Sequence, residues 1–348
     1  MKEIVEKDNE TITEVESPLK KVEKKAVVKK GSDKMTIEDL PGVGSATAEK
    51  LKEVGYDDLM SIAVASPSEL TESSGMGDNV AKRIIQVARK NLDIGFESGE
   101  ELLKKRALVT RVSTNSENFN ELLGGGIETG SITECYGAYG SGKTALAHQL
   151  VCSTQTELGD DPTLDPIVVW IDTEGTLRPE RVEQISKAMG LDPMRSLKNI
   201  RAVRAFNSDH QMLLAEKVED LIKKDGLNVK LVIVDSLMSH FRSEFIGRGT
   251  LADRQQKLNK HMHVLLKLSQ NHNIAVYITN QVMSKPDTFF GDPTVAIGGH
   301  IVAHASTTRV YLRRGKKGSR VAKLVDSPCL PDGECMFFVT DAGIRDDA

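Results

Sequence analysis

The sequence predicts an α/β protein in which a doubly wound, mostly parallel sheet follows a small all-α domain. From Leu108 onward, strand-like and helix-like segments alternate, which is typical of a parallel sheet covered by helices on both faces. After about Thr307 the strand-like segments are joined by short turns, which predicts antiparallel strands at the C-terminal end. Between Thr36 and Leu92, apolar residues recur with helical spacing, which predicts the small helical domain.

The elements of the main domain follow from runs of residues with the period of a strand or of a helix. The strands that we expect are 131–136, 167–172, 230–235, 274–280, 307–314, 319–325 and 334–340. The helices that we expect are 144–158, 179–190, 209–224 and 250–271.

Composition limits the class of protein. The 348 residues, 39% of them hydrophobic, suffice for a sizeable core, and the net charge of −4 argues against coating of nucleic acid by overall charge. The 4 cysteines lack C-x-x-C spacing, which predicts reduced thiols that are buried or half-buried, as in cytosolic proteins. Neither a membrane-length apolar run nor a signal region is present, so we expect a soluble, intracellular protein.

The chain divides into four parts by composition. Residues 1–35 mix Lys and Glu with few large apolar residues, which predicts a disordered charged tail. Residues 36–92 form the helical domain, residues 93–106 a linker, and residues 107–348 the main domain. The linker contains a lone aromatic residue, Phe96, which either packs on its own domain or inserts into a neighbouring subunit.

Two glycine-containing turns, 40–44 and 74–77, interrupt the helical domain, and their backbone N–H groups can reach a phosphate. The first turn is similar to the hairpin of helix-hairpin-helix DNA-binding modules, with Lys50 and Lys52 on the helix that follows. The alternative is a turn that does no more than join two helices.

A phosphate-binding loop follows the first strand of the main domain. The pattern G-x-x-x-x-G-K-[ST] is formed by Gly137, Ala138, Tyr139, Gly140, Ser141, Gly142, Lys143 and Thr144. The glycines let successive N–H groups point at phosphate oxygens, the lysine adds a mobile cation, and the threonine hydroxyl suits Mg²⁺. A chance match in a Gly-rich turn is the alternative, but the strand and helix on either side favour a nucleoside triphosphate site.

Polar residues end three further strands at the same expected edge of the sheet. Asp235 follows a buried apolar strand and suits Mg²⁺ beside Thr144. Glu174 lies just beyond another strand, where it can orient a water molecule for attack on the γ-phosphate. Gln281 ends a third strand, where a neutral amide can sense the γ-phosphate and pass that state to the following loop. We therefore expect Glu174, Lys143 and Gln281 to be catalytic.

From about Arg106 to Ile344 the chain resembles the ATPase core of the RecA-fold recombinases, specifically the archaeal RadA recombinases and their eukaryotic counterparts. The stretches that carry the resemblance are GAYGSGKTALAHQL, DTEGTLRPERV, FNSDHQMLL, LVIVDSLMSHFR, GRGTLADRQQKL, ITNQV, IGGHIVAHASTTRVYLRRG and DSPCLPDGE. The helical domain and the linker match the layout of that family as well.

The resemblance implies two DNA-binding segments. The first extends from Arg242 to about Gln256 and includes Arg248 as a phosphate contact, although a surface cation is the alternative for Arg248. The second is 282–299, in which Lys285 contacts DNA and Val282 inserts between bases. Its glycines and prolines suggest a loop that becomes ordered on DNA.

The resemblance also implies that ATP binds between subunits. Residues 326–332 match a segment that caps the ATP of the adjacent subunit, so Asp326 and Pro331 would contact nucleotide there, and Asp326 and Asp332 would hold a monovalent cation such as K⁺. Arg181 would cover the adenine with its planar guanidinium. His304 resembles a γ-phosphate relay residue, for which a core histidine is the alternative.

Phe96 and Gly99 match the polymerisation motif of the family, in which an aromatic residue docks into the next subunit. The family often has Ala where this chain has Gly99. The missing methyl group reduces the free energy of burial at the docking site by about 1 kcal/mol, which is too little to abolish docking. Leu177 stands where the family usually has Phe, and Met238 stands where it commonly has a small hydroxyl residue. Both side chains in this sequence are apolar.

The expected function is therefore that of a DNA-dependent ATPase that forms a helical filament on single-stranded DNA and exchanges strands with duplex DNA. ATP and Mg²⁺ would be its cofactors, with K⁺ as a further cation, and recombination mediators would be additional partners in the cytoplasm, at the nucleoid. Two alternatives remain open: an ATP-binding paralogue that assists a recombinase without exchanging strands, and a hexameric helicase with the same core fold.

Overall fold

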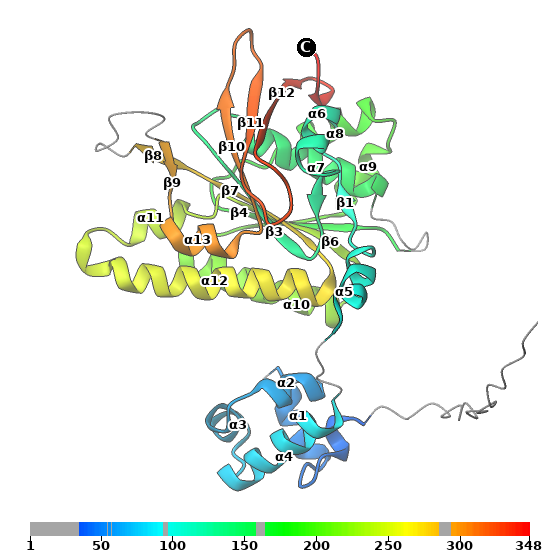
Figure 1. Ribbon diagram of the computed structural model, residues 1–348, viewed down its shortest axis with the longest axis vertical. Coiled ribbons are helices and arrows are strands. Elements are labelled where there is room, and N and C mark those ends of the chain that lie inside the picture. The colour runs from blue at the N-terminus through cyan, green and yellow to red at the C-terminus, as the bar shows by residue number, and fades with distance from the viewer. Residues whose placement is uncertain (1–34, 54, 57, 93–96, 158–163, 285–293) are drawn as a thin grey trace, which may run out of the picture. The chain divides into compact units, whose positions relative to one another are not determined.

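The computed structural model describes residues 35–348 except 54, 57, 93–96, 158–163 and 285–293. The chain divides into two compact units, Met1–Ser98 and Gly99–Ala348 (Figure 1). The charged tail predicted for residues 1–35 lies outside the described residues except for Met35. None of the described helices has the length and apolar character that a membrane-spanning helix needs.

The N-terminal unit is a small bundle of helices. They are the 3₁₀-helix η1 (Ile37–Asp39), α1 (Ser45–Glu53), α2 (Leu59–Val64), α3 (Pro67–Ser74) and α4 (Asp78–Asn91). Asp58 and Ser66 begin α2 and α3 as N-caps that accept hydrogen bonds from backbone N–H groups of the first turn. The side chains of Leu51, Ile62 and Ile84 are fully buried at its centre, so the helical spacing of the apolar residues indeed marks a core.

The second unit is built on a nine-stranded sheet with the order β13-β12-β11-β10-β3-β7-β6-β4-β5. Its strands are β3 (Ser131–Tyr136), β4 (Ile167–Asp172), β5 (Ile200–Arg204), β6 (Val229–Asp235), β7 (Ala275–Asn280), β10 (Thr308–Arg314), β11 (Arg320–Asp326), β12 (Gly333–Thr340) and β13 (Gly343–Arg345). Strands from β10 to β5 in this order pair in parallel, whereas β10 to β13 pair antiparallel. The predicted fold class is therefore confirmed, and each predicted strand ends within one residue of the observed one.

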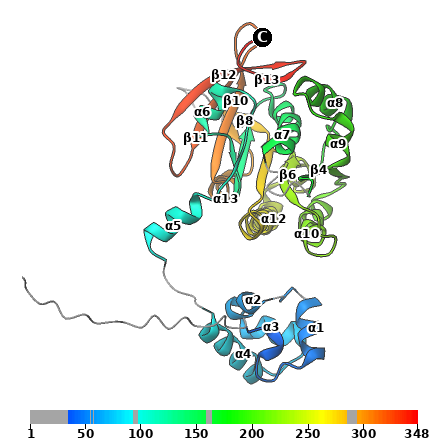
Figure 2. The same ribbon diagram turned by 90° about the vertical axis from the view of Figure 1, so that its right-hand side faces the viewer.

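Helices cover both faces of this sheet (Figures 1 and 2). They are α6 (Glu117–Leu122), α7 (Lys143–Glu157), α8 (Pro179–Ala188), α9 (Pro193–Lys198), α10 (Ser208–Lys223), α11 (Ser239–Glu244), the 3₁₀-helix η2 (Arg248–Thr250), α12 (Leu251–His272) and α13 (Gly299–Ala305). Successive residues of β4 face opposite sides: Trp170 packs in a core with α7 and α8, whereas Ile171 packs in a second core with α10 and α12. This alternation is the physical basis of the doubly wound architecture.

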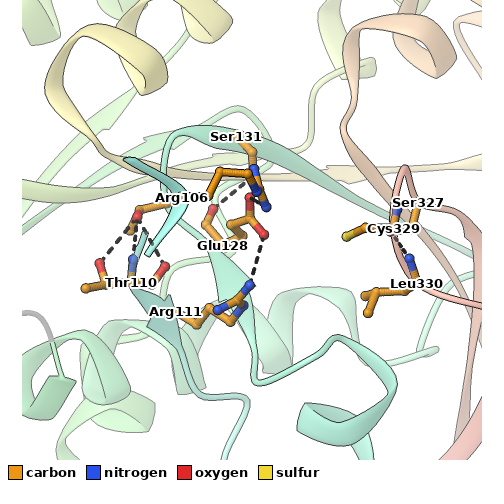
Figure 3. Close-up of polar contacts among 9 residues, drawn as sticks. Arg106, Thr110, Arg111, Glu128, Ser131, Ser327, Cys329 and Leu330 are labelled. Atoms are coloured by element: carbon orange, nitrogen blue, oxygen red, sulfur yellow. Dashed lines mark hydrogen bonds and ion pairs between the residues drawn. The ribbon is translucent and has the colours of Figure 1, made fainter. Parts of the chain in front are cut away.

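Part of the predicted linker is helical. Residues Gly99–Arg106 form α5, with acidic residues in its first turn and basic residues in its last turn, an arrangement that favours a helix. Arg106 and Arg111 both point at the carboxylate of Glu128, at 2.9 Å and 3.4 Å (Figure 3). These ion pairs connect the end of α5 to the short antiparallel pair β1 (Arg111–Val112) and β2 (Ile127–Glu128).

Candidate functional site

The phosphate-binding loop connects β3 to α7 in a conformation that requires glycine. Gly140 and Gly142 have φ angles of 71° and 106°, in the left-handed region that other residues rarely adopt. A Cβ atom on Gly137 would lie 2.1 Å from the carbonyl oxygen of Leu312, and one on Gly140 would lie 2.2 Å from Nη2 of Arg314. A side chain is therefore excluded at Gly137, which packs against the backbone of β10, whereas at Gly140 the positive φ is what favours glycine.

Lys143 is the first residue of α7, and its side chain bends back over the loop. Its Nζ donates hydrogen bonds to the carbonyl oxygens of Gly137 at 2.8 Å and Ala138 at 3.1 Å. Burial lowers the pKa of this ammonium group, while the charges of Asp235 and Glu174 oppose the shift. The group is thus a partly desolvated cation, which strengthens its attraction to an anion entering the loop.

Asp235 ends β6 in a buried position surrounded by hydroxyl groups. Its Oδ2 accepts hydrogen bonds from Thr144 at 2.8 Å and Thr176 at 2.9 Å, and its Oδ1 accepts one from Thr279. Burial raises the pKa of Asp235, although the three hydroxyl donors act in the opposite direction. The adjacent carboxylate and Thr144 hydroxyl are hard oxygen ligands of the type that Mg²⁺ prefers, so this donor set fits the ion.

Glu174 and Gln281 lie together, as expected from their positions at the carboxyl ends of parallel strands. Oε1 of Glu174 accepts hydrogen bonds from Ser236 Oγ at 2.6 Å and from Gln281 Nε2 at 2.8 Å. Oε1 of Gln281 in turn accepts one from Arg242 at 3.4 Å. A series of side-chain contacts therefore runs from α11 to Glu174.

The loop that carries Glu174 is shaped by Asp172 at the end of β4. Its carboxylate accepts hydrogen bonds from four successive backbone N–H groups, those of Glu174, Gly175, Thr176 and Leu177, at 2.6–3.2 Å. This geometry turns the chain so that Thr176 reaches Asp235 and Glu174 reaches Ser236. The sequence motifs do not indicate this role of Asp172.

His148 on α7 contacts the end of the loop that carries Glu174. Its Nδ1 lies 2.7 Å from the carbonyl oxygen of Thr144, and its Nε2 accepts a hydrogen bond from the backbone N–H of Arg178 at 2.9 Å. Because Nε2 accepts, the ring is neutral with its proton on Nδ1. Burial lowers the pKa of His148 to about 4, which keeps the ring neutral near pH 7.

The phosphate-binding loop and the strand ends enclose a cavity of about 630 Å³. Glu174, Asp235, Gln281 and Val282 line it together with Lys143, Thr144 and five of the other six loop residues. Ser141, also predicted, is buried and does not line it. Lining residues that the sequence analysis did not identify are Ala145, Thr176, Arg178, Ser236, Arg320 and Val339. Arg320 and Val339 come from β11 and β12, and the motif of the phosphate-binding loop does not indicate that these strands reach the cavity.

Arg181 does not line this cavity. Its guanidinium donates hydrogen bonds to the backbone carbonyl oxygens of Thr340 and, at 2.9 Å, Asp341. His304 is exposed rather than in the core, and its ring stacks on that of His300 with centroids 5.7 Å apart.

The predicted cap residues also lie away from the cavity of their own chain. Asp326, Pro331 and Asp332 are absent from its lining, and the last two instead line a second cavity of about 550 Å³ beside α6 and β12. Figure 3 shows how this segment turns: the Ser327 hydroxyl accepts hydrogen bonds from the N–H groups of Cys329 and Leu330. Contrary to expectation, Cys329 is exposed; like the other cysteines, it is free.

The remaining predicted residues are only partly described. Phe96 and Lys285 lie outside the described residues, as does the side chain of Arg248, whose backbone belongs to η2. Arg242 is exposed on α11, and Gly99 begins α5. At the two ends of the predicted DNA-binding loop, β8 (Val282–Ser284) pairs antiparallel with β9 (Thr294–Ala296), so these ends are strands rather than irregular chain.

Comparison with known families gives two matches. A family model described as Rad51 matches residues 105–347, which is more than half of the chain. A model described as a SAM-like helix-hairpin-helix tandem matches residues 35–90. The first covers the nine-stranded unit with its cavity, and the second covers the helical unit.

Proposed function

The chain belongs to the Rad51 family of RecA-type recombinases, and from this premise we propose that it forms helical filaments on single-stranded DNA and exchanges strands with homologous duplex DNA. In this proposal it acts as the archaeal RadA recombinases do. The observation that carries the proposal is the series of contacts from Arg242 through Gln281 to Glu174. It connects a cation in the predicted DNA-binding segment to the carboxylate in the nucleotide cavity, as a DNA-dependent ATPase requires.

In the proposed reaction, Lys143 leaves the carbonyl oxygens of Gly137 and Ala138 and binds the β- and γ-phosphates. Thr144 and Asp235 hold Mg²⁺, which neutralises charge on these phosphates when bound. Glu174 accepts a hydrogen bond from the attacking water and orients it for attack on the γ-phosphorus. Ser236 and Gln281 orient Glu174, and Asp172 fixes the loop that carries it.

We propose that the nucleotide site is completed by a second copy of the chain. Asp326, Pro331 and Asp332 do not line the cavity of their own chain, which supports the idea that they cap the cavity of a neighbour. Asp326 and Asp332 would then hold K⁺ beside the γ-phosphate, and His304 would relay the state of that phosphate. Arg181 would release its carbonyl partners to stack on the adenine.

Assembly and DNA binding use other parts of the chain in this proposal. Phe96, with Gly99, docks into the next subunit. Arg242, Arg248, Val282 and Lys285 contact DNA, and the helix-hairpin-helix unit adds phosphate contacts. The domain boundaries predicted from the sequence, a location in the cytoplasm at the nucleoid, and binding of mediator proteins belong to the same proposal.

Electron microscopy with single-stranded DNA and a non-hydrolysable ATP analogue tests the proposal together with a strand-exchange assay. Helical filaments and joint molecules are the expected results. Filaments or ATP binding without joint molecules would favour the accessory paralogue instead. Closed hexamers that unwind a forked duplex would favour a helicase.

A further inference from the structure

A buried carboxylate lies beside the nucleotide cavity but does not line it. Glu134 on β3 is fully buried, and its Oε2 forms an ion pair with Nε of Arg309 on β10 at 2.6 Å. The Arg309 guanidinium also lies over the ring of Tyr136, 5.3 Å from its centroid. Burying a carboxylate is costly unless its oxygens are paired, so the other oxygen, Oε1, also needs a donor.

That donor is Asn280, the last residue of β7. Its Nδ2 donates to Glu134 Oε1 at 2.7 Å and to the carbonyl oxygen of Ile297 at 2.6 Å. Its Oδ1 accepts a hydrogen bond from the N–H of Gln281 at 2.8 Å. The N–H of Ile297 donates to the carbonyl oxygen of Gln281 at 3.0 Å. Of these four hydrogen bonds, the one from Asn280 to Glu134 reaches β3. The other three connect Asn280, Gln281 and Ile297, which flank the segment 282–296.

Charge fixes the orientation of the Asn280 amide. A carboxylate accepts hydrogen bonds and does not donate them, so the NH₂ group of Asn280 must face Glu134. The amide oxygen then faces Gln281, whose N–H it accepts. With the backbone of Gln281 held in this way, its side chain extends toward Glu174.

We propose that Glu134 is a positioning residue that locks Asn280 and, through it, the two ends of the segment 282–296 and the backbone of Gln281. The consequence for activity rests on the proposed function, in which this segment contacts DNA and Gln281 contacts Glu174. Without the lock, DNA bound to the segment would no longer set the position of Gln281. Hydrolysis of ATP would then lose its dependence on DNA.

The lock, meaning the hydrogen bonds of Asn280 with Glu134, Ile297 and Gln281, can be tested by hydrogen–deuterium exchange of the full chain. Neither nucleotide nor DNA is needed for this measurement. In the wild type, the N–H groups of Gln281 and Ile297 should exchange slowly. Asn280→Asp keeps the shape of the side chain but loses both donated hydrogen bonds and faces Glu134 with a second carboxylate, so exchange at these two amides should accelerate at least ~10-fold. The amide of Val276 in the same strand should be unchanged.

Glu134→Gln is a second variant, which brings an NH₂ group against either Arg309 or Asn280 and should also accelerate exchange. Glu334→Gln is its control, because Glu334 forms an exposed ion pair with Arg313 on the same strand as Arg309. Rapid exchange in the wild type would overturn the proposal. The proposal would also be overturned if the amides of Gln281 and Ile297 exchanged as slowly in Asn280→Asp and Glu134→Gln as in the wild type.

A second measurement separates positioning from simple support of the fold. The rate of ATP hydrolysis with single-stranded DNA, divided by the rate without it, should fall by about 10-fold in both variants, while their affinity for a fluorescent ADP analogue stays within about threefold of wild type. An unchanged ratio despite accelerated exchange would refute the coupling role. If the wild type itself shows no stimulation by DNA, the proposed function fails, whereas the exchange data still decide whether the lock exists.

Discussion

Gln281 donates a hydrogen bond from Nε2 to Oε1 of Glu174 at 2.8 Å, although 107 residues separate them in the chain. The two side chains meet because β7 and β4 are parallel strands on either side of β6, so their carboxyl ends lie at one edge of the sheet. The contact places the residue that precedes a predicted DNA-binding segment on the carboxylate that we expect to orient water.

Glu174→Gln should reduce ATP hydrolysis by roughly 10²–10³-fold, because an amide is a much poorer base for a water molecule than a carboxylate. Nucleotide affinity should change little, since the side chain of Glu174 accepts its hydrogen bonds from Ser236 and Gln281. Steady-state phosphate release and binding of a fluorescent ADP analogue measure the two quantities. Glu183→Gln, at an exposed ion pair on α8, is the matched control. Near-wild-type hydrolysis by Glu174→Gln would exclude this role.

Lys143→Ala should weaken ATP binding by about 100-fold or more, because charge-assisted hydrogen bonds to the phosphates are lost. Titration calorimetry measures the affinity. Lys187→Ala removes an exposed lysine of α8 and should bind ATP normally. Equal affinities for the two variants would show that the cavity is not the triphosphate site.

Arg320→Gln should raise the Kd for nucleotide by roughly 10-fold. The sequence motifs do not predict that Arg320 takes part in nucleotide binding. Arg320 lines the cavity, its Nη1 donates to the carbonyl oxygens of Gly318 and Ser319, and its Nε has no partner among the described residues. Loss of a partly desolvated cation near the phosphates weakens binding on this scale. Lys323→Gln changes an exposed residue of the same strand and serves as the control. If both variants bind alike, Arg320 has no role in binding.

Stability should fall as the pH decreases from about 6.5 to about 4. Burial lowers the pKa of His148 and His261 to about 4, so in this window the unfolded chain binds more protons than the folded chain. The free energy of unfolding then rises with pH, by roughly 3 kcal/mol per histidine across the window.

Urea unfolding at several pH values, followed by the fluorescence of the single tryptophan, measures this effect in the second unit. The reporter is well placed, since Trp170 lies 4.9 Å from His148, centroid to centroid. His148→Gln should flatten the pH dependence by about half. A midpoint that does not change between pH 7 and pH 4.5 would contradict the neutral buried histidines.

Phe96→Ala should give monomers with little DNA-stimulated ATP hydrolysis, because an aromatic anchor of an interface is removed. Light scattering and electron microscopy report the state of assembly. Gly99→Ala is the contrasting variant: space for a Cβ atom is open at Gly99 in the single chain, and an added methyl group should strengthen docking by up to about 1 kcal/mol. Normal filaments from Phe96→Ala would remove the assignment.

The central strands could be predicted closely because they are buried on both faces and therefore consist of apolar runs. The edge strand β5 was not predicted, since Ile200–Arg204 is only partly buried and contains two arginines that break the pattern. The helix α5 was not predicted either. It buries no side chain, so apolar spacing carries no signal there, and its charges alone indicate it.

In the candidate site, too, some residues could be predicted from local sequence patterns and others could not. The phosphate-binding loop, Glu174, Asp235 and Gln281 could be found because each sits in a short motif at the end of a strand. Arg320 and His148 could not, because their positions depend on which distant segment folds against the loop.

The sequence by itself determined the alternation of strands and helices, the Gly-rich loop that we expect to bind phosphate, and the family resemblance, because these reside in residues that are neighbours along the chain. The tertiary structure decided that Thr144, Thr176 and Thr279 share Asp235, and that Asn280 joins Glu134 to Ile297. These contacts connect residues from 17 to 146 positions apart. They exist because the sheet order brings strand ends together, and no local pattern in the chain encodes that order.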